Sequence, residues 1–267
     1  MIHSFSCKNF YSFKNLTTVD FKVNEKAPNN DAYFKADSGW RLSKIETVIG
    51  PNASGKTNLL KVLPFLKWLI VNSFNTSPDA PLPIKPFLFG ANKNKPVELL
   101  VDFEINGHIF VYTFVLDESK IILEELKIKN KSIEKVTAKK VFSRRWHEEI
   151  KAYELDDKKF NLPKGIKDSL RLNASVISVA ARFNHKNSLE VFNFWKKVET
   201  NVVEAGWVGD RLLPNSGQQL VEALDFFSEK ENIHIKNEAE KLLSQFDLGL
   251  DSLEIVKEKK DNSLNIK

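Results

Sequence analysis

The chain has 267 residues, of which 42% are hydrophobic and 28% are charged, and this balance is typical of a globular protein with a sizeable core. A single cysteine, Cys7, excludes an internal disulfide framework and predicts a cytoplasmic protein. The net charge of +5 permits contact with nucleic acid without requiring it, and the basic runs at residues 127–140 and 144–147 fit either a solvated hairpin or helix face or a surface that contacts phosphates.

The first 49 residues predict three strands. Residues 2–7 form the first, and residues 17–23 form the second because their apolar and polar side chains alternate. Residues 24–39 are polar and predict a loop. Residues 45–49 are rich in β-branched side chains and end on a glycine, so they predict a strand directly before the next motif.

That motif is an octapeptide at residues 50–57, which matches the G-x-x-x-x-G-K-[ST] pattern of a phosphate-binding loop. Its glycines let successive backbone N–H groups point at phosphate oxygens. We expect Lys56 to reach the β- and γ-phosphates as the catalytic cation, and the Thr57 hydroxyl to ligate Mg²⁺. The nucleotide-binding residues predicted from the pattern are Gly50, Pro51, Asn52, Ala53, Ser54, Gly55, Lys56 and Thr57.

A helix is predicted over residues 56–74, which are rich in leucine and contain no glycine. It is too apolar for a solvated helix, so we expect it to lie buried against a sheet, with a kink at Pro64. Because Lys61, Pro64 and Lys67 interrupt its apolar stretch, it neither spans a bilayer nor resembles a secretory signal. We therefore expect no membrane partner.

An antiparallel arm is predicted next, from three alternating segments at residues 97–105, 108–116 and 121–128. Asn106-Gly107 joins the first two and is a strong signal for a two-residue hairpin turn.

The end of the second segment, Asp117-Glu118, imitates the acidic pair that holds Mg²⁺ and polarises the attacking water in nucleotide hydrolysis. We reject this assignment. Tyr112 and Thr113 interrupt the apolar run expected of a central parallel strand, and the hairpin predicts that Asp117 lies in a turn.

The second half of the chain predicts helices at residues 166–179, 188–203, 217–230 and 237–246, from apolar spacings of three and four. Residues 250–267 become strand-like again around Leu253 and Ile255 and then end in lysines. No metal-ligand spacing links the five scattered histidines.

Two of these segments carry a family resemblance. Residues 2–14 are similar to the opening strand and N-F-x-S-F segment of ABC-type ATPase heads of the RecF, SMC and OLD sort. Residues 50–60 are similar to their G-x-N-x-[SA]-G-K-[ST]-N-[LI]-L loop, which adds Asn58 to the loop residues. The chain resembles in particular the stand-alone AAA/OLD-like ATPases of bacterial abortive-infection and other anti-phage systems. The resemblance covers residues 1–130, and more weakly the helical part.

The resemblance implies an α/β fold of the P-loop NTPase type, with a mixed sheet above the buried helix, the antiparallel strand arm and a helical subdomain. We expect three parts: a P-loop lobe with its strand arm over residues 1–160, a helical lid over 161–248, and the start of a second lobe over 249–267. The implied function is binding of ATP with Mg²⁺ and, in the intact protein, hydrolysis coupled to head dimerisation. A homo-oligomer, a nuclease or toxin effector and nucleic acid are the partners that such systems suggest.

The chain also departs from this family, which pairs the loop of one subunit with a serine-glycine signature of another. Ser216-Gly217 fits a helix N-cap better than that signature, and Arg182 stands where the family places a glutamine that contacts metal and water. Either the chain is the N-terminal part of a longer ATPase, which we favour, or it is a short protein that binds nucleotide without completing catalysis.

Two other function classes stay open. One is a non-catalytic scaffold or nucleic-acid clamp switched by nucleotide, and the other is a P-loop kinase or GTPase. The kinase or GTPase would need an acceptor site or a base-reading motif such as N-K-x-D, and the sequence contains neither.

Overall fold

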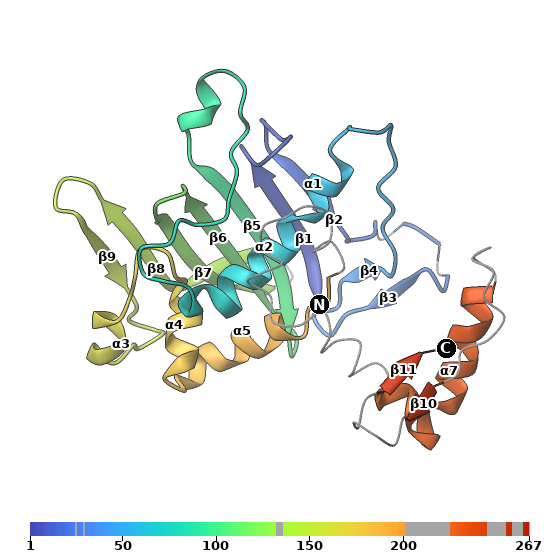
Figure 1. Ribbon diagram of the computed structural model, residues 1–267. Helices are drawn as coiled ribbons and strands as arrows, with labels where there is room; N and C mark the ends of the chain where they lie inside the picture. Colours follow the sequence, from blue (N-terminus) through green and yellow to red (C-terminus); the bar gives the residue numbers. More distant parts are fainter. Residues whose placement is uncertain are drawn as a thin grey trace. The chain divides into compact units, whose positions relative to one another are not determined.

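The computed structural model describes residues 1–24, 26–28, 30–131, 136–200, 225–244, 255–257 and 264–266 (Figure 1). The chain divides into two compact units, Met1–Leu212 and Leu213–Lys267. Within the described ranges, no helix combines the length and the hydropathy needed to cross a membrane.

A seven-stranded sheet forms the first unit, in the order β2-β1-β5-β6-β7-β8-β9 (Figure 1). Its strands are β1 (Ile2–Lys8), β2 (Thr17–Asp20), β5 (Val97–Ile105), β6 (His108–Leu116), β7 (Ile121–Lys131), β8 (Val136–His147) and β9 (Ala152–Asp156). A separate two-stranded sheet pairs β3 (Tyr33–Lys35) with β4 (Arg41–Ser43). Every pairing in the large sheet is antiparallel, so the prediction of a mixed sheet is wrong for the described strands.

The predicted strand at residues 45–49 is also absent from the described structure, because these residues belong to no strand. Ile45 and Ile49 are 79% and 88% exposed. Their β-branched side chains favour extended backbone, but a strand also needs a neighbour that pairs with its backbone N–H and C=O groups. None of the described strands supplies that neighbour.

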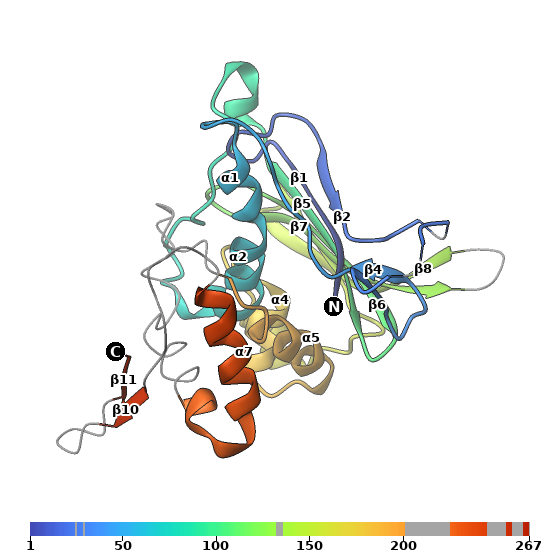
Figure 2. The same cartoon turned by 90° about the vertical axis from the view of Figure 1, so that its right-hand side faces the viewer.

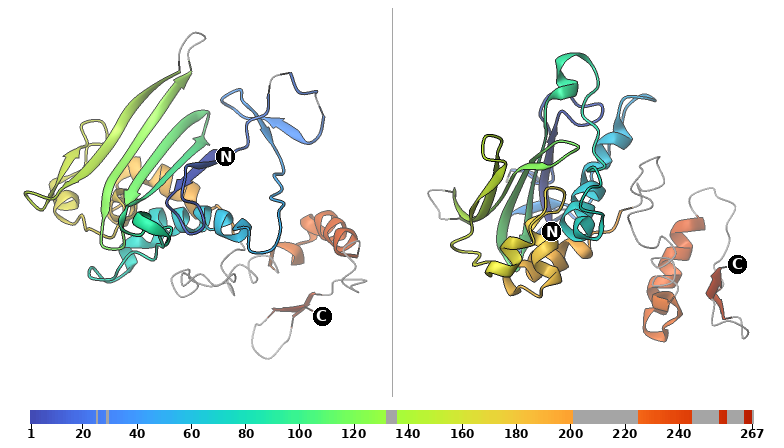
Figure 3. Two further views of the ribbon diagram at one scale, coloured as in Figure 1. Left: turned by 90° about the horizontal axis from the view of Figure 1, so that it is seen from above. Right: turned by 60° about the vertical axis from the view of Figure 1, so that its left-hand side comes forward.

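The antiparallel arm agrees with the prediction. β5 and β6 pair from Val97↔Leu116 to Ile105↔His108, and β7 continues the meander. Asn106 and Gly107 both have positive φ, 50° and 77°, as the two-residue hairpin turn requires. The sequence did not reveal β8 and β9. The described parts of the basic run, residues 127–131 and 136–140, lie in β7 and β8, which project past the neighbouring strands (Figure 3).

The predicted helix at residues 56–74 is present as a run of short helices. It comprises α1 (Lys56–Leu60), α2 (Val62–Lys67), the π-helix η1 (Trp68–Asn72) and the 3₁₀ turn η2 (Ser73–Asn75). The expected effect of Pro64 appears as a break at Lys61, because a proline has no N–H for the Leu60 carbonyl four residues earlier. The run packs on one face of the sheet (Figure 2) through the buried side chains of Val62, Phe65, Leu66, Trp68, Leu69 and Ile70.

Two further helices, α4 (Val176–Arg182) and α5 (Lys186–Lys196), cover the same face (Figure 2), and α3 (Lys164–Asp168) precedes them in the chain. The prediction of a single helix over residues 166–179 is wrong, because residues 169–175 are not helical. There, Arg171 and Asn173 donate hydrogen bonds to backbone carbonyls of residues 74–80. Ser175 then caps α4 by accepting a hydrogen bond from the Ser178 N–H at 3.0 Å.

Aromatic side chains fill the layer between α5 and the sheet. The ring of Phe103 on β5 lies 4.9 Å from that of Phe194 and 5.7 Å from that of Trp195. Trp195 is fully buried. The helices and the sheet therefore share one core, which fixes α5 on the strands beneath it.

The second unit contains η6 (Lys230–Asn232), α7 (Ile233–Ser244) and an antiparallel hairpin of β10 (Ile255–Lys257) with β11 (Leu264–Ile266). α7 corresponds to the helix predicted from residue 237, and β10 includes the strand-like Ile255. Leu253, residues 217–224 of a predicted helix and the Ser216-Gly217 pair lie outside the described residues.

Candidate functional site

The predicted phosphate-binding loop connects the exposed residues 45–49 to the first turn of α1. Ala53 and Gly55 have φ of 62° and 92°, and the Ser54 N–H donates to the Pro51 carbonyl at 3.3 Å. Two left-handed residues so close together turn the chain sharply, and glycine accepts that conformation without a steric penalty. Gly55 of the pattern thus occupies a position at which the turn requires a left-handed backbone conformation.

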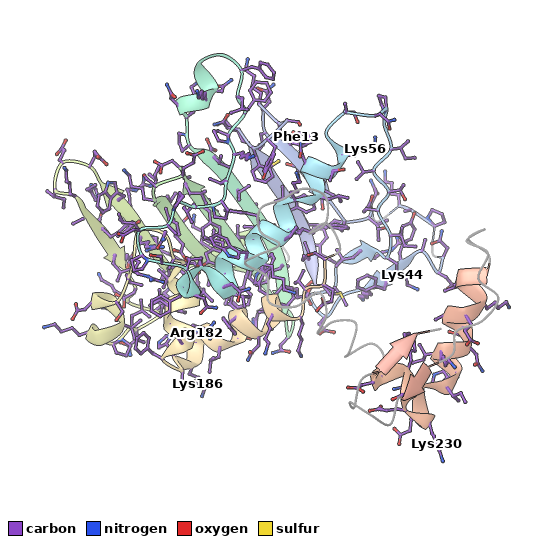
Figure 4. The ribbon with its side chains drawn as sticks, in the orientation of Figure 1. Phe13, Lys44, Lys56, Arg182, Lys186 and Lys230 are labelled. Atoms are coloured by element: carbon purple, nitrogen blue, oxygen red, sulfur yellow. The ribbon has the colours of Figure 1, made fainter. Side chains whose placement is uncertain are left out.

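Lys56 places a positive charge over this loop. Its ammonium donates to the backbone carbonyls of Gly50 and Pro51, both at 2.7 Å. The side chain therefore folds back over the residues that the pattern assigns to phosphate binding, and Figure 4 shows it beside Phe13 at one end of the unit.

Thr57 is the loop residue predicted to ligate Mg²⁺, and it is exposed. The described residues contain no group of three or more histidine, cysteine, aspartate or glutamate side chains that could hold a metal ion by themselves. A single hydroxyl still suits Mg²⁺, which keeps several waters and takes substrate phosphates as ligands.

A turn at residues 9–13 supports the loop, and the pattern alone did not reveal it. A Cβ at Gly55 would lie 3.0 Å from the Ser12 Cβ and 3.7 Å from the Phe13 ring. The Asn58 side chain donates to the Ser12 hydroxyl at 2.6 Å. The loop therefore packs directly on this turn, and Asn58 fixes the contact.

Asn9 anchors the other side of the same turn. With φ of 56°, it directs its side-chain NH₂ to the carbonyls of Asn92, Lys95 and Pro96, at 3.0, 2.8 and 3.3 Å. The next residue, Phe10, is fully buried in the core. The N-F-x-S-F segment thus has a structural explanation: asparagine holds the 92–96 loop, phenylalanine enters the core, and serine contacts the phosphate-binding loop.

Lys61, one turn after Thr57, is a second cation near the loop that the motif did not predict. It is only 7% exposed, and its ammonium lies 4.6 Å from the centre of the Tyr11 ring. Burial lowers the pKa of Lys61, and the charge of Lys85 lowers it further.

Asp117 lies in the turn between β6 and β7, as expected. Its Oδ1 accepts hydrogen bonds from the Ser119 N–H at 2.7 Å, the Ser119 hydroxyl at 2.6 Å and the Lys120 N–H at 2.9 Å. Such a carboxylate stabilises its own turn. The hairpin reading of Asp117-Glu118 is therefore confirmed.

Arg182 is not near the loop, so the comparison with the family's glutamine is wrong. It is the exposed last residue of α4, and the next ring, Phe183, lies 6.4 Å from Phe74 at the far end of the helical run. A helical run over residues 56–74 is roughly 25–30 Å long. Figure 4 accordingly shows Arg182 and Lys56 at opposite ends of the unit.

Comparison with known proteins gives one family. The model described as "AAA domain, putative AbiEii toxin, Type IV TA system" matches residues 47–187, which is more than half of the chain. The chain belongs to this family. The matched part of the AAA domain runs from the loop through β5–β9 to α3 and α4, while β1 and the turn at residues 9–13 lie outside it. No curated protein matches the chain significantly.

Proposed function

We propose that this AAA domain binds ATP with Mg²⁺ at residues 50–58. The observation that carries the proposal is the complete octapeptide in a left-handed loop that opens the helical run and packs on the Ser12 turn. On binding, the Lys56 ammonium would exchange the Gly50 and Pro51 carbonyls for phosphate oxygens. Thr57 would supply one oxygen to Mg²⁺, which neutralises phosphate charge when it is bound.

We further propose that the intact protein is an ATPase that couples hydrolysis to association of two such heads in an anti-phage or toxin–antitoxin system. The family description, which names a toxin of such a system, supports this role. The N-F-x-S-F segment supports a head of the RecF, SMC and OLD sort, because each of its four defined residues has a place in the loop's support. A homo-oligomer and a nuclease or toxin effector belong to the same proposal.

A nucleotide-switched scaffold without hydrolysis is the alternative. It is favoured by one observation: within the described structure, no cluster of acidic side chains that could hold a metal accompanies the loop, and Asp117 is engaged in its own turn. ATP binding is common to both proposals, so it is tested first.

Calorimetry with ATP and Mg²⁺ on the wild type and on Lys56→Ala tests the assignment. We expect the variant to lose about a hundredfold or more in affinity, because a charge-assisted contact to phosphate is removed. Its melting temperature should stay unchanged, since the Lys56 ammonium donates its hydrogen bonds to loop carbonyls and is not part of the core. Lys44→Ala, an exposed lysine before the loop, is the matched control. Equal affinity in Lys56→Ala and the wild type would refute the proposal.

A further inference from the structure

A groove of about 330 Å³ lies between α5 and the β6–β8 part of the sheet, and neither the loop nor its support includes any of it. Its apolar lining consists of Phe110, Leu126, Ile128, Val141, Phe160 and Val191. Three lysines, Lys139, Lys140 and Lys159, stand around this lining together with Asn187 and Glu190.

The groove exists because the helix-side face of the hairpin continues beyond the helix that covers it. Val191 of α5 is buried, whereas Ile128 of β7 and Val141 of β8 are only partly buried. A register shift adds to this: Leu126 pairs with Phe142 and Lys127 with Lys140, so Val141 is the extra residue of a β-bulge. Bulges bend a strand and redirect its side chains.

Charge around the groove is predominantly positive. Lys140 pairs with Asp156 at 3.1 Å, but Lys139 and Lys159 form no ion pair with any residue that the structure describes. Lys139 pairs with Ile128 in the ladder, which puts a lysine on the otherwise apolar face. Glu190 is the one acidic residue in the lining. An occupant that combines apolar groups with negative charge would complement both features.

We propose that this groove binds an acidic amphipathic helix of a partner protein, with two apolar side chains in the groove and Asp or Glu residues beside Lys139 and Lys159. Two observations select a helix. β7 is paired on both sides along the groove, whereas β8 pairs with β9 only over Ser143–His147 and, among the described strands, has a free edge over residues 136–142. A strand added at that edge would extend the sheet in its own plane and would leave the groove on the face of the sheet unfilled. The volume is about twice the ~150 Å³ of a dry cavity that holds one benzene, so it suits two large apolar side chains.

Fluorescence anisotropy with a labelled synthetic peptide tests the proposal on the full chain. The probe is a capped helical peptide with Leu and Phe four positions apart and Glu at the flanking positions. One matched peptide replaces Leu and Phe by Ala, and a second replaces Glu by Lys. The protein variant is Lys139→Glu with Lys159→Glu, and Lys164→Glu on α3 is the control, since all three lysines are exposed.

We expect the acidic apolar probe to bind, and both matched peptides to bind about tenfold more weakly or worse. The double variant should show the same loss, Lys164→Glu should not, and NMR signals of Ile128 and Val191 should shift with the probe. Three results would overturn the proposal: no binding of the probe, undiminished binding in the double variant, or equally tight binding of the Ala peptide. The last result would mean that the groove binds a purely anionic ligand such as nucleic acid. Concentration-dependent dimerisation that the double variant abolishes would also overturn it, because a second copy would then fill the groove.

Discussion

At the scale of single residues, the phosphate-binding loop depends on backbone conformation as much as on the charge of Lys56. Gly55 has φ of 92°, and any Cβ there would approach the Ser12 Cβ at 3.0 Å. A side chain at this position meets two penalties, one from the left-handed backbone and one from the turn on which the loop packs. Both act at the N-cap of α1, directly before Lys56.

Gly55→Ala should therefore lose ATP affinity and destabilise the fold by about 1–3 kcal/mol. Calorimetry and urea unfolding measure the two effects. Gly165→Ala is the matched control, because Gly165 lies in α3, has no positive φ and would place its Cβ in open space. We expect the control to leave ATP binding unchanged and to stabilise by up to about 1 kcal/mol. Wild-type binding by Gly55→Ala would show that the loop tolerates a different backbone.

His3 is a second residue whose surroundings decide its behaviour. It is fully buried, and its Nε2 lies 2.7 Å from Glu104 Oε2. Burial lowers the pKa of His3 below 6.5, although Glu104 opposes the shift. Burial also acts on Glu104, but hydrogen bonds from Ser38 and His3 outweigh it and hold the pKa of Glu104 below its usual value.

These directions predict how stability responds to acid. As the pH falls below about 6.5, the unfolded chain protonates His3 before the folded chain does, so the free energy of unfolding decreases. Protonation of Glu104 lowers the free energy of unfolding only at lower pH, because the pKa of Glu104 in the folded chain is depressed. Unfolding in urea between pH 7 and 5 should therefore show a shallower decline for His3→Gln than for the wild type. The exposed His108→Gln should follow the wild type, and an equal decline in all three would contradict this assignment.

At the scale of elements, a buried ion pair joins the strand arm to the helices. Arg144 of β8 donates through Nε to Glu124 of β7 at 2.7 Å, and through Nη2 to the Ala174 carbonyl at 2.5 Å. Glu124 also accepts from the Val176 N–H at the start of α4 and from the Tyr112 hydroxyl. Both charged side chains are fully buried. This network therefore fixes α4 on three neighbouring strands.

Arg144→Met should destabilise the fold by about 3–5 kcal/mol, because it leaves the Glu124 charge buried without its partner. Lys140→Met on the same strand should cost less than about 1 kcal/mol, since its pair with Asp156 is exposed. Urea unfolding of the two variants measures the difference. Equal losses in the free energy of unfolding for the two variants would mean that the buried pair of Arg144 and Glu124 stabilises the fold no more than the exposed pair of Lys140 and Asp156.

At the scale of the whole molecule, the loop belongs to the first unit, in which one large antiparallel sheet with helices on a single face presents the loop, with its supporting turn, at one end (Figure 2). The loop connects directly to exposed apolar residues, and Ile49 is 88% exposed. In the part of the chain that the structure describes, the loop has the complete octapeptide and its structural support, and no group of three or more acidic, histidine or cysteine side chains is placed to hold a metal.

The 267-residue chain should accordingly bind ATP but turn it over slowly, and Asp117→Asn combined with Glu118→Gln should not change the rate. The reason is that Asp117 stabilises the β6–β7 turn and has no role at the loop. A phosphate-release assay on the wild type and the double variant measures this, with Lys56→Ala as the background control. Turnover that the double variant stops would identify the pair as the acidic residues of catalysis.

The sequence by itself determined the features that depend on residues close together in the chain. The Asn106-Gly107 turn requires two residues with positive φ, so the β5–β6 hairpin could be read directly. The octapeptide and the break caused by Pro64 are local for the same reason, because each depends on backbone geometry within a few residues. The support of the loop could be located through the N-F-x-S-F resemblance, but its contacts could not.

Only the tertiary structure decided the features that need a distant partner. Residues 45–49 have the composition of a strand, yet no described strand pairs with them. The helix predicted over 166–179 is interrupted because Arg171 and Asn173 bond to carbonyls about 95 residues earlier in the chain. The sequence predicted that Arg144 belongs to a basic surface, but its ion pair with Glu124 places it in the core. In each case the competing hydrogen bonds or charges come from far along the chain, and local propensity is too weak to oppose them.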